Sequence, residues 1–312
     1  MPRLEELKAL CQVIEQKSFS RAARLLGLSQ PAVSLQVKSL EAEFGAELLH
    51  RDGFEITPTE SGQIVYQFAC QVIDLYERSK QRLGELNGQA GGKLRVGAST
   101  GPGEYLLPLL LGQFKQRQPR VEIALRVGDS SEIVDYILQH RLELGFVGHT
   151  RRDRHLYFEP FLHDRLVLVV YPAHPWASQG QISYQELLRA PLILQQHGSG
   201  AVAALQQALE QHSIDYEQLN VVMEVGLQES TKAAVRAGFG ATIISRLGVL
   251  EELKRGDLVE VSIEGLEMGR DFYIVYRRTS ALTNLARTFL EFARGAVDVM
   301  PQAESAIESR RA

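Results

Sequence analysis

Apolar residues in the first ninety positions recur every three or four residues, the spacing that places them on one face of a helix. This periodicity predicts helices over 4–16, over about 18–26 and from Ser29 to Phe44. Gly27 separates the last two, because glycine adopts the left-handed backbone of a sharp helix exit without strain. The predicted inward positions of these two helices are Ala22, Ala23, Leu25, Leu26, Val33, Val37 and Leu40.

The helix after Gly27 has a polar outer face. Ser29 is placed to cap its first turn, where Pro31 is tolerated because the N–H groups there have no helical partner. The outer face carries Gln30, Ser34, Leu35 and Lys38, which are short or polar groups of the kind that enter a DNA major groove. Between residues 16 and 40 there are four Lys or Arg and no acid, so phosphate contacts are also expected.

Two further elements complete the first part of the chain. The stretch from Glu47 to Thr57 predicts a short ribbon that turns at Asp52-Gly53. Thr59 to Leu86 predicts one helix of about 40 Å, from a rise of 1.5 Å per residue. Its apolar seam predicts pairing with the same helix of another subunit, and packing against its own chain is the alternative. The seam consists of Val65, Phe68, Val72, Leu75 or Tyr76, Leu83 and Leu86.

Several separated motifs resemble the winged helix-turn-helix of LysR-type transcriptional regulators, over roughly the first sixty positions. They are Ala22-Ala23, Ser29-Gln30-Pro31-Ala32-Val33-Ser34, Leu40-Glu41, Leu48-Leu49-His50-Arg51 and Thr57-Pro58-Thr59-Glu60-Ser61-Gly62. The family usually has Phe at the position of Leu49, which is a mild apolar departure. The competing interpretation is a generic three-helix bundle with a chance basic patch.

The pattern changes after the glycine-rich break at 87–92, where short apolar runs alternate with helical segments. This order predicts a parallel α/β sheet, with 156–161 and 166–171 as separate strands and a single helix over 103–118. Two such lobes resemble the periplasmic-binding-protein-like effector domain of the family. The expected domains are a winged helix-turn-helix at 1–60, a linker helix at 61–88, lobe I at 93–162 with 267–297, lobe II at 163–266 and a tail at 298–312.

Ligands of open α/β sheets bind beyond the carboxyl ends of the strands. Glycines, hydroxyls and amides follow several predicted strands here, and Ser99-Thr100 also precedes a helix whose N–H groups favour an anion. Each of these residues has an alternative role as an ordinary helix cap or loop residue. The expected contacts of a small polar or anionic effector are Ser99, Thr100, Ser130, His149, Ser199 and, with less support, Gln228.

Composition excludes some classes of function but does not identify the function itself. The net charge is −4, and residues 1–62 hold seven Lys or Arg against nine Asp or Glu, so DNA binding must rest on a local patch. No apolar run spans a membrane and no signal peptide begins the chain, so a cytoplasmic location is expected. The spacing of Cys11 and Cys70 predicts neither a zinc site nor a redox pair. No cofactor is expected, and no nucleophile–base–acid set can be assembled.

The sequence therefore predicts a ligand-responsive transcription factor and not an enzyme. Gln30, Pro31, Ser34 and Lys38 are expected to read or approach DNA, whereas Leu35 offers only contact with a thymine methyl or packing. The expected partners are an inverted-repeat operator, an effector, further copies of the chain as a dimer or tetramer, and RNA polymerase. The rivals are a small-molecule-binding module and an enzyme on the same lobes. Expected phosphate contacts are Ser20, Arg21, Ser29, Arg51 and Thr57.

Overall fold

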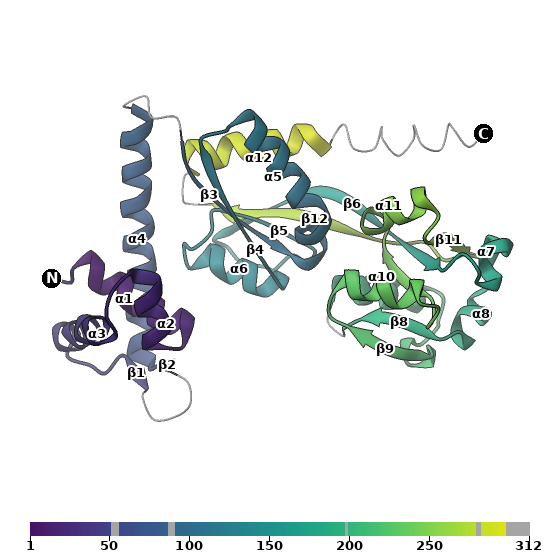
Figure 1. The fold of residues 1–312 in the computed structure, drawn as a ribbon, viewed down its shortest axis with the longest axis horizontal. Coiled ribbons are helices and arrows are strands. Elements are labelled where there is room, and N and C mark those ends of the chain that lie inside the picture. The colour runs from purple at the N-terminus through teal and green to yellow at the C-terminus, as the bar shows by residue number, and fades with distance from the viewer. Residues whose placement is uncertain (51–55, 87–90, 197–198, 279–281, 298–312) are drawn as a thin grey trace. The chain divides into compact units, whose positions relative to one another are not determined.

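The computed structural model describes residues 1–50, 56–86, 91–196, 199–278 and 282–297. Its internal contacts divide the chain into two units, residues 1–92 with 135–142, and residues 93–134 with 143–312. The elements of the first unit (Figure 1) are α1 (Leu4–Gln16), α2 (Phe19–Leu26), α3 (Gln30–Phe44), β1 (Leu49–His50), β2 (Thr57–Pro58) and α4 (Glu60–Leu86).

The first unit folds around one small apolar core. Helices α1, α2 and α3 surround Leu10, Ala22, Val37 and Leu40, whose side chains are almost inaccessible to solvent. The first half of α4 closes this core with Val65, Tyr66, Ala69 and Cys70. The predicted inward position of Leu25 is wrong, because its side chain is 64% exposed. Helix α2 spans barely two turns, so its inward stripe is narrow and Ala22 and Ala23 already fill it.

The second unit alternates strands and helices along the chain. Its lobe I elements are β3 (Gly92–Ser99), the π-helix η1 (Pro102–Leu106), α5 (Leu107–Arg117), β4 (Val121–Gly128), α6 (Ser130–Leu138, shared with the first unit), β5 (Leu144–Val147) and α12 (Asn284–Val297). Its lobe II elements are α7 (Pro175–Gln179), β7 (Gln181–Ile182), α8 (Tyr184–Arg189), β8 (Leu192–Gln195), α9 (Gly200–Gln211), the 3-10 helix η2 (Tyr216–Gln218), β9 (Val221–Val225), α10 (Gln228–Arg236), β10 (Thr242–Ser245), α11 (Arg246–Arg255) and β11 (Val259–Ile263).

Two long antiparallel strands, β6 (Leu156–Val170) and β12 (Met268–Arg277), run through both lobes. They belong to a sheet of order β4-β3-β5-β12-β6-β11-β7, in which β10 also pairs with β6. A separate pair, β8 and β9, is parallel and lies in lobe II. The crossing strands are visible in Figure 1 as the connection between the two halves of this unit.

Three predictions about the second unit need correction. The predicted strands 156–161 and 166–171 are one strand, Leu156–Val170, because β12 continues to pair with β6 through residues 162–165, past a register shift between Phe272 and Tyr273. The sheet is mixed and not wholly parallel, since β12 is antiparallel to β5 and to β6. The predicted helix over 103–118 begins as the π-helix η1 and continues as α5.

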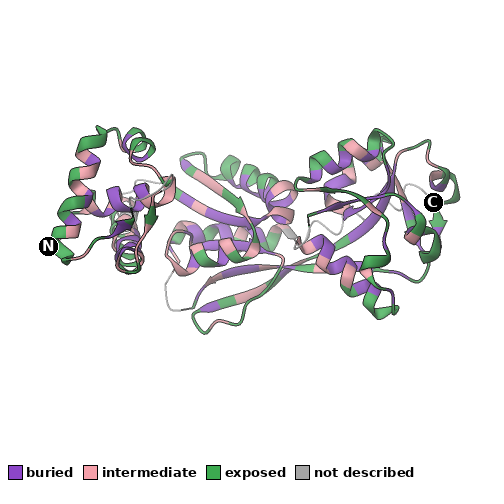
Figure 2. Ribbon diagram, turned by 90° about the horizontal axis from the view of Figure 1, so that it is seen from below, coloured by how far each residue is buried: buried purple, intermediate pink, exposed green. Residues whose placement is uncertain are grey.

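Each lobe has its own apolar core. Lobe I packs aromatic rings between α5, α12 and the sheet, with the Phe289 ring centroid 5.1 Å from that of Phe114 and 6.1 Å from that of Phe146. Lobe II buries aliphatic side chains such as Leu192, Leu205 and Ile243. Figure 2 shows the result, with strands such as β5, β8 and β10 buried and the outward faces of the helices exposed. The lobes are thus separately packed bodies that share two strands.

Candidate functional site

The turn between α2 and α3 is built from local caps. Ser18 Oγ accepts a hydrogen bond from the Arg21 backbone N–H at 3.3 Å, and Ser29 Oγ accepts one from Ala32 at the same distance. Gly27 ends α2 with φ of 67°, which a residue with a side chain adopts only with strain. These contacts fix where α3 begins, and the burial of Val33 and Val37 fixes which face it turns outward.

The outward face of α3 carries the predicted DNA-reading residues. Leu35 is 69% exposed, and Ser34 is partly buried between it and the core. Ser29 is exposed as a residue, although its hydroxyl already serves the cap. Arg51 lies outside the described residues, so its predicted role stays a prediction. The remaining candidates are all exposed, namely Ser20, Arg21, Gln30, Pro31, Lys38 and Thr57.

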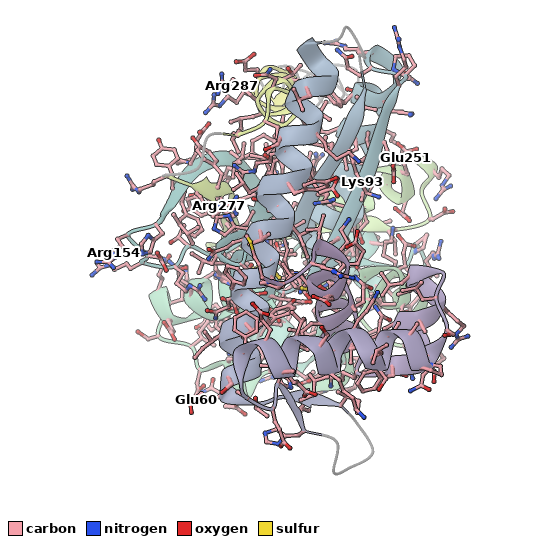
Figure 3. The ribbon with its side chains drawn as sticks, turned by 90° about the vertical axis from the view of Figure 1, so that its left-hand side faces the viewer. Glu60, Lys93, Arg154, Glu251, Arg277 and Arg287 are labelled. Atoms are coloured by element: carbon pink, nitrogen blue, oxygen red, sulfur yellow. The ribbon has the colours of Figure 1, made fainter. Side chains whose placement is uncertain are left out.

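The β1–β2 ribbon is held against the start of α4 by Thr59. The Thr59 hydroxyl donates to the Glu47 carbonyl at 2.7 Å and accepts from the Gly62 N–H at 2.9 Å, while its own backbone N–H donates to Leu48 O at 3.0 Å. Gly62 is needed here, because the first side-chain carbon of any other residue would lie 1.9 Å from Leu48 O. Figure 3 marks Glu60 at this end of α4, beside the ribbon.

The apolar residues of α4 lie partly in the core of its own unit and partly on its exposed surface. Val65 is buried in the core of its own unit, in line with the alternative that the seam packs within the chain. The side chain of Leu86 lies outside those that the structure describes. Along the same helix an apolar stripe stays uncovered, with exposures of 64% for Ile64, 44% for Phe68, 68% for Leu75, 45% for Tyr76 and 60% for Leu83. A stripe of this length leaves α4 with apolar surface that its own unit does not bury.

In lobe I the predicted effector residues lie at strand ends, but some of their groups are already engaged. Ser99 is buried, and its hydroxyl accepts from the Gly148 N–H at 3.2 Å. Thr100 is partly buried and His149 is exposed. Ser130 begins α6, where the neighbouring Asp129 supplies the cap by accepting from Glu132 N at 2.7 Å. Ser99 therefore joins two strand ends, and its side chain is a structural tie as well as a candidate contact.

In lobe II the two candidates differ in how they are used. Ser199 is the cap of α9, since its hydroxyl accepts from the Val202 N–H at 3.2 Å. Gln228 begins α10, is only 1% exposed, and has a side-chain oxygen that is buried without a hydrogen-bond partner. A buried polar atom without a partner is costly, so Gln228 is the lobe II candidate with an unmet requirement.

A buried ion pair at the crossing of β6 and β12 is absent from the sequence prediction. Arg270 Nε donates to Asp164 Oδ2 at 3.0 Å, and Ser245 Oγ donates to Asp164 Oδ1 at 2.6 Å. Asp164 is completely buried, and this burial raises the pKa of its carboxyl, which the Arg270 charge partly offsets. Neighbouring positions in paired strands bring these groups together although 106 residues separate them, a distance that no local motif can signal.

The guanidinium of Arg270 lies among the strand-end loops. It stacks on the Phe272 ring at 5.0 Å, and a side-chain carbon at Gly101 would lie 2.8 Å from its Nη2. A carbon at Gly200 would lie 2.7 Å from its Nη1 and 3.6 Å from His149 Nε2. The structure thus brings His149, the α9 start and the Thr100-Gly101 turn to Arg270. Ser130 and Gln228 are the first residues of α6 and α10.

The two cysteines lie together in the core of the first unit. Cys11 Sγ on α1 and Cys70 Sγ on α4 are 3.9 Å apart, and both are free thiols within the core of the first unit. The hydrogen bond to Cys70, with burial, raises the pKa of the Cys11 thiol. Among the residues that the structure describes, no cluster of His, Cys, Asp and Glu is arranged to hold a metal ion. None of the described helices has the length and hydropathy needed to cross a bilayer.

Comparison with known proteins gives matches along nearly the whole chain. Residues 4–63 match the family model of the bacterial regulatory helix-turn-helix protein of the lysR family, and residues 87–298 match the LysR substrate binding domain. The HTH-type transcriptional activator CmpR of Synechocystis sp. is 30% identical over 289 residues, which cover 93% of this chain and 94% of that protein. The uncharacterized HTH-type transcriptional regulator YeiE of Escherichia coli K12 is also 30% identical over 289 residues, covering 93% and 96%.

Proteins of known structure also have a similar fold. The full-length CbnR crystallised with its target DNA has a TM-score of 0.66 at 22% identity, covering 94% of this chain and 99% of that one. The regulatory domain of Synechocystis PCC6803 CcmR, in complex with 2-PG, has a TM-score of 0.59 at 27% identity, covering 66% and 97%. At 22% identity the first of these speaks for the fold alone.

Proposed function

The chain belongs to the LysR family of DNA-binding transcriptional regulators, and we propose that it binds an inverted-repeat operator as a homodimer controlled by a small metabolite. The observation that carries the proposal is the outward face of α3, exposed along Gln30, Leu35 and Lys38 and fixed by caps at its start. A DNA-binding regulator works where the DNA is, so the proposed location is the cytoplasm. We also propose the predicted domain limits, namely a winged helix-turn-helix at 1–60, a linker helix at 61–88, lobe I at 93–162 with 267–297, lobe II at 163–266 and a tail at 298–312.

In this proposal α3 enters the major groove. Gln30, Pro31, Ser34 and Lys38 read or approach the bases, and Leu35 contacts a thymine methyl. The phosphate contacts come from Ser20, Arg21, Ser29, Arg51 and Thr57, and they supply most of the salt-dependent affinity. Lys38 and Arg21 are exposed and are not held in any ion pair that the described residues show, which leaves their charge available to DNA.

The uncovered stripe on α4 supports pairing of two chains. Ile64, Phe68, Leu75 and Leu83 lie on the exposed side of a 27-residue helix, while Val65 and Ala69 are buried within the same chain. A second copy of α4 would bury the stripe and set the separation of the two α3 helices on one face of the DNA. Assembly of dimers into a tetramer, and contact with RNA polymerase, are further parts of the proposal.

The effector is proposed to bind between the lobes of the second unit, in contact with Ser99, Thr100, Ser130, His149, Ser199 and Gln228. The buried, unpartnered oxygen of Gln228 and the helix start at Ser199 support this placement. The solved structure of the CcmR regulatory domain is a complex with 2-PG, which supports a small anionic metabolite here as well. Effector binding would then shift the balance between lobe arrangements by its differential affinity for them.

Two serines on α3 allow a matched test of DNA reading. Ser34 lies on the proposed reading face, whereas Ser39 donates a hydrogen bond to Glu6 Oε1 at 2.8 Å on the side toward α1. We expect Ser34→Ala to weaken binding to the operator about two- to tenfold, the value of one hydrogen bond of about 0.5–1.5 kcal/mol. Ser39→Ala should retain operator binding. Mobility shifts on DNA from upstream of the gene, at two salt concentrations, measure both.

The outcomes separate the rival functions. Salt-dependent, sequence-specific retardation that Ser34→Ala weakens and Ser39→Ala leaves intact supports the proposal. Absence of any retardation would favour a small-molecule-binding module, and turnover of a bound metabolite would favour an enzyme on the same lobes. Suppose that a metabolite binds between the lobes and the DNA footprints with and without it are identical. This result would exclude control of DNA binding by an effector at that site.

A further inference from the structure

Arg270 is a buried cation with unused bonding capacity. Its side chain is 9% exposed, its Nε is occupied by Asp164, and its Nη2 is buried without a hydrogen-bond partner. Each carboxylate oxygen of Asp164 accepts a hydrogen bond, from Arg270 or from Ser245. A guanidinium carries five N–H donors in a planar fork that suits carboxylates and phosphates. One edge of this fork is therefore available for an acceptor that the described protein residues do not supply.

The free edge of the fork faces loops from both lobes. Gly101 follows β3 of lobe I and Gly200 begins α9 of lobe II, and a side chain at either position would collide with the guanidinium. Helix α9 has twelve residues, so its first N–H groups and its dipole add positive potential at Gly200. His149 Nε2 lies near the same point. Donors from three segments converge where an anion would be stabilised.

Two buried side-chain acceptors lie on the helix that follows Gly101 and on a neighbouring helix from lobe II. Glu104 on η1 has a buried Oε2 without a partner, and Gln228 on α10 has a buried Oε1 without one. The two residues belong to different lobes, and the Gln228 backbone N–H bonds to the Glu104 carboxylate. Burial raises the pKa of Glu104, because its charge is poorly hydrated there. The Tyr105 hydroxyl is a neighbouring donor for Glu104, whereas Gln228 Oε1 has no hydrogen-bond partner among the described residues.

We propose that the effector is a small hydroxylated organic anion whose carboxylate or phosphate binds the Arg270 fork and whose hydroxyl donates to Gln228 Oε1. This inference rests on the proposed effector site between the lobes. It adds the chemical class of the ligand and the residue that selects it. Arg270 belongs to neither lobe alone, since it lies on a strand that both share. An anion bound to Arg270 and to the α9 start therefore joins the lobes across their boundary.

The ion pair predicts opposite effects of its two members on anion binding. Asp164→Asn removes the negative charge beside the guanidinium and leaves the fork in place, so we expect anion affinity to rise at least threefold. Arg270→Gln removes the fork, so anion affinity should fall at least tenfold. Because a buried charge without its partner destabilises the fold, the double variant Asp164→Asn/Arg270→Gln provides a neutral pair that folds and does not bind.

Matched probes identify the chemistry of the ligand on the full-length chain. Thermal shift and calorimetry would compare glycerate with glycerol for the charge, glycerate with propionate for the hydroxyls, and 3-phosphoglycerate with glycerate for phosphate against carboxylate. We expect a charged, hydroxylated probe to bind and its uncharged or hydroxyl-free counterpart not to bind. Saturating probe raises the unfolding temperature by mass action, so the shift must scale with concentration.

The results overturn the inference in three ways. Absence of binding by every anionic probe contradicts it, as does binding that Arg270→Gln and the double variant retain. Equal binding of propionate and glycerate contradicts the hydroxyl contact at Gln228. Operator retardation without ligand is measured on the same preparations, so loss of DNA binding, which would refute the proposed function, is seen separately from loss of anion binding.

Discussion

Replacing Gly62 by alanine should disrupt the packing of the β1–β2 ribbon against α4. In most helices this change is favourable by about 0.5–1 kcal/mol, because alanine loses less backbone entropy than glycine. At Gly62 the new carbon would lie 1.9 Å from Leu48 O and 2.8 Å from Leu48 C, both of which are backbone atoms. The backbone of either α4 or the ribbon must therefore move by about 1 Å or more to reach ordinary contact.

The expected cost follows from what this movement breaks. Overpacking of a closely fitted site costs about 1–3 kcal/mol. The movement also strains the bonds from Thr59 N to Leu48 O and from Thr59 Oγ1 to Glu47 O, each worth about 1 kcal/mol. After the helix-propensity gain is subtracted, we expect Gly62→Ala to destabilise the first unit by about 2–4 kcal/mol. Operator binding should fall with it, because the ribbon loses its support.

Two control variants isolate the steric effect. Ser61→Ala changes the preceding residue in the same turn, and we expect a change within about 0.5 kcal/mol. Gly112→Ala in α5 meets nothing within 4 Å, so it should stabilise the second unit by about 0.5–1 kcal/mol. Urea unfolding followed by far-UV circular dichroism gives the free energies, and hydrogen exchange by mass spectrometry assigns each loss to its unit. A Gly62→Ala chain as stable as Ser61→Ala would refute the reasoning.

Three further predictions concern charge and packing. Arg21→Ala should weaken binding to all DNA sequences alike and reduce the slope of log K against log salt by about 0.9, and an unchanged slope in a salt titration would remove Arg21 from the phosphate contacts. Phe289→Ala removes a fully buried ring from the lobe I core and should cost about 3–5 kcal/mol, measured by urea unfolding. Glu104→Gln should raise the unfolding temperature at pH 7. Burial raises the pKa of Glu104 above 4.5, so its ionised form costs stability, fully at pH above the folded pKa and not at all well below 4.5. The advantage of the glutamine variant in thermal melts should therefore shrink as the pH falls toward 4.5.

The first unit was predictable because its signals are local. Ser29 and Gly27 act within one turn of the chain, and the helical period identifies Val33, Val37 and Leu40 as core. Leu25 was misplaced because a two-turn helix has room inward for only part of an apolar run. The strand ends of the second unit are also predictable from the sequence, and Gln228 follows one of them, that of β9.

The remaining features depend on contacts that no local sequence pattern predicts. Asp164 and Arg270 meet because they are paired positions of β6 and β12, and neither residue lies at a strand end. Hydroxyl groups of the same type also differ in use, since Ser199 caps α9 and Ser99 ties two strand ends. Cys11 and Cys70 are adjacent through the packing of α1 on α4, across 59 residues of sequence. For Asp164, Ser99 and the two cysteines, tertiary packing, and not local preference, decides the partner.

The register of the crossing strands has a consequence for how this architecture arose and how it can be rebuilt. Leu166 and Met268 face each other as paired residues, and everything between them forms lobe II. Paired residues in antiparallel strands have Cα atoms about 4.5–5.5 Å apart, a gap that a two-residue hairpin closes. Lobe II is thus topologically an insertion into a single hairpin of lobe I. Exchange of this cassette between relatives would transplant half of a binding site while leaving the recipient's lobe I connections uncut.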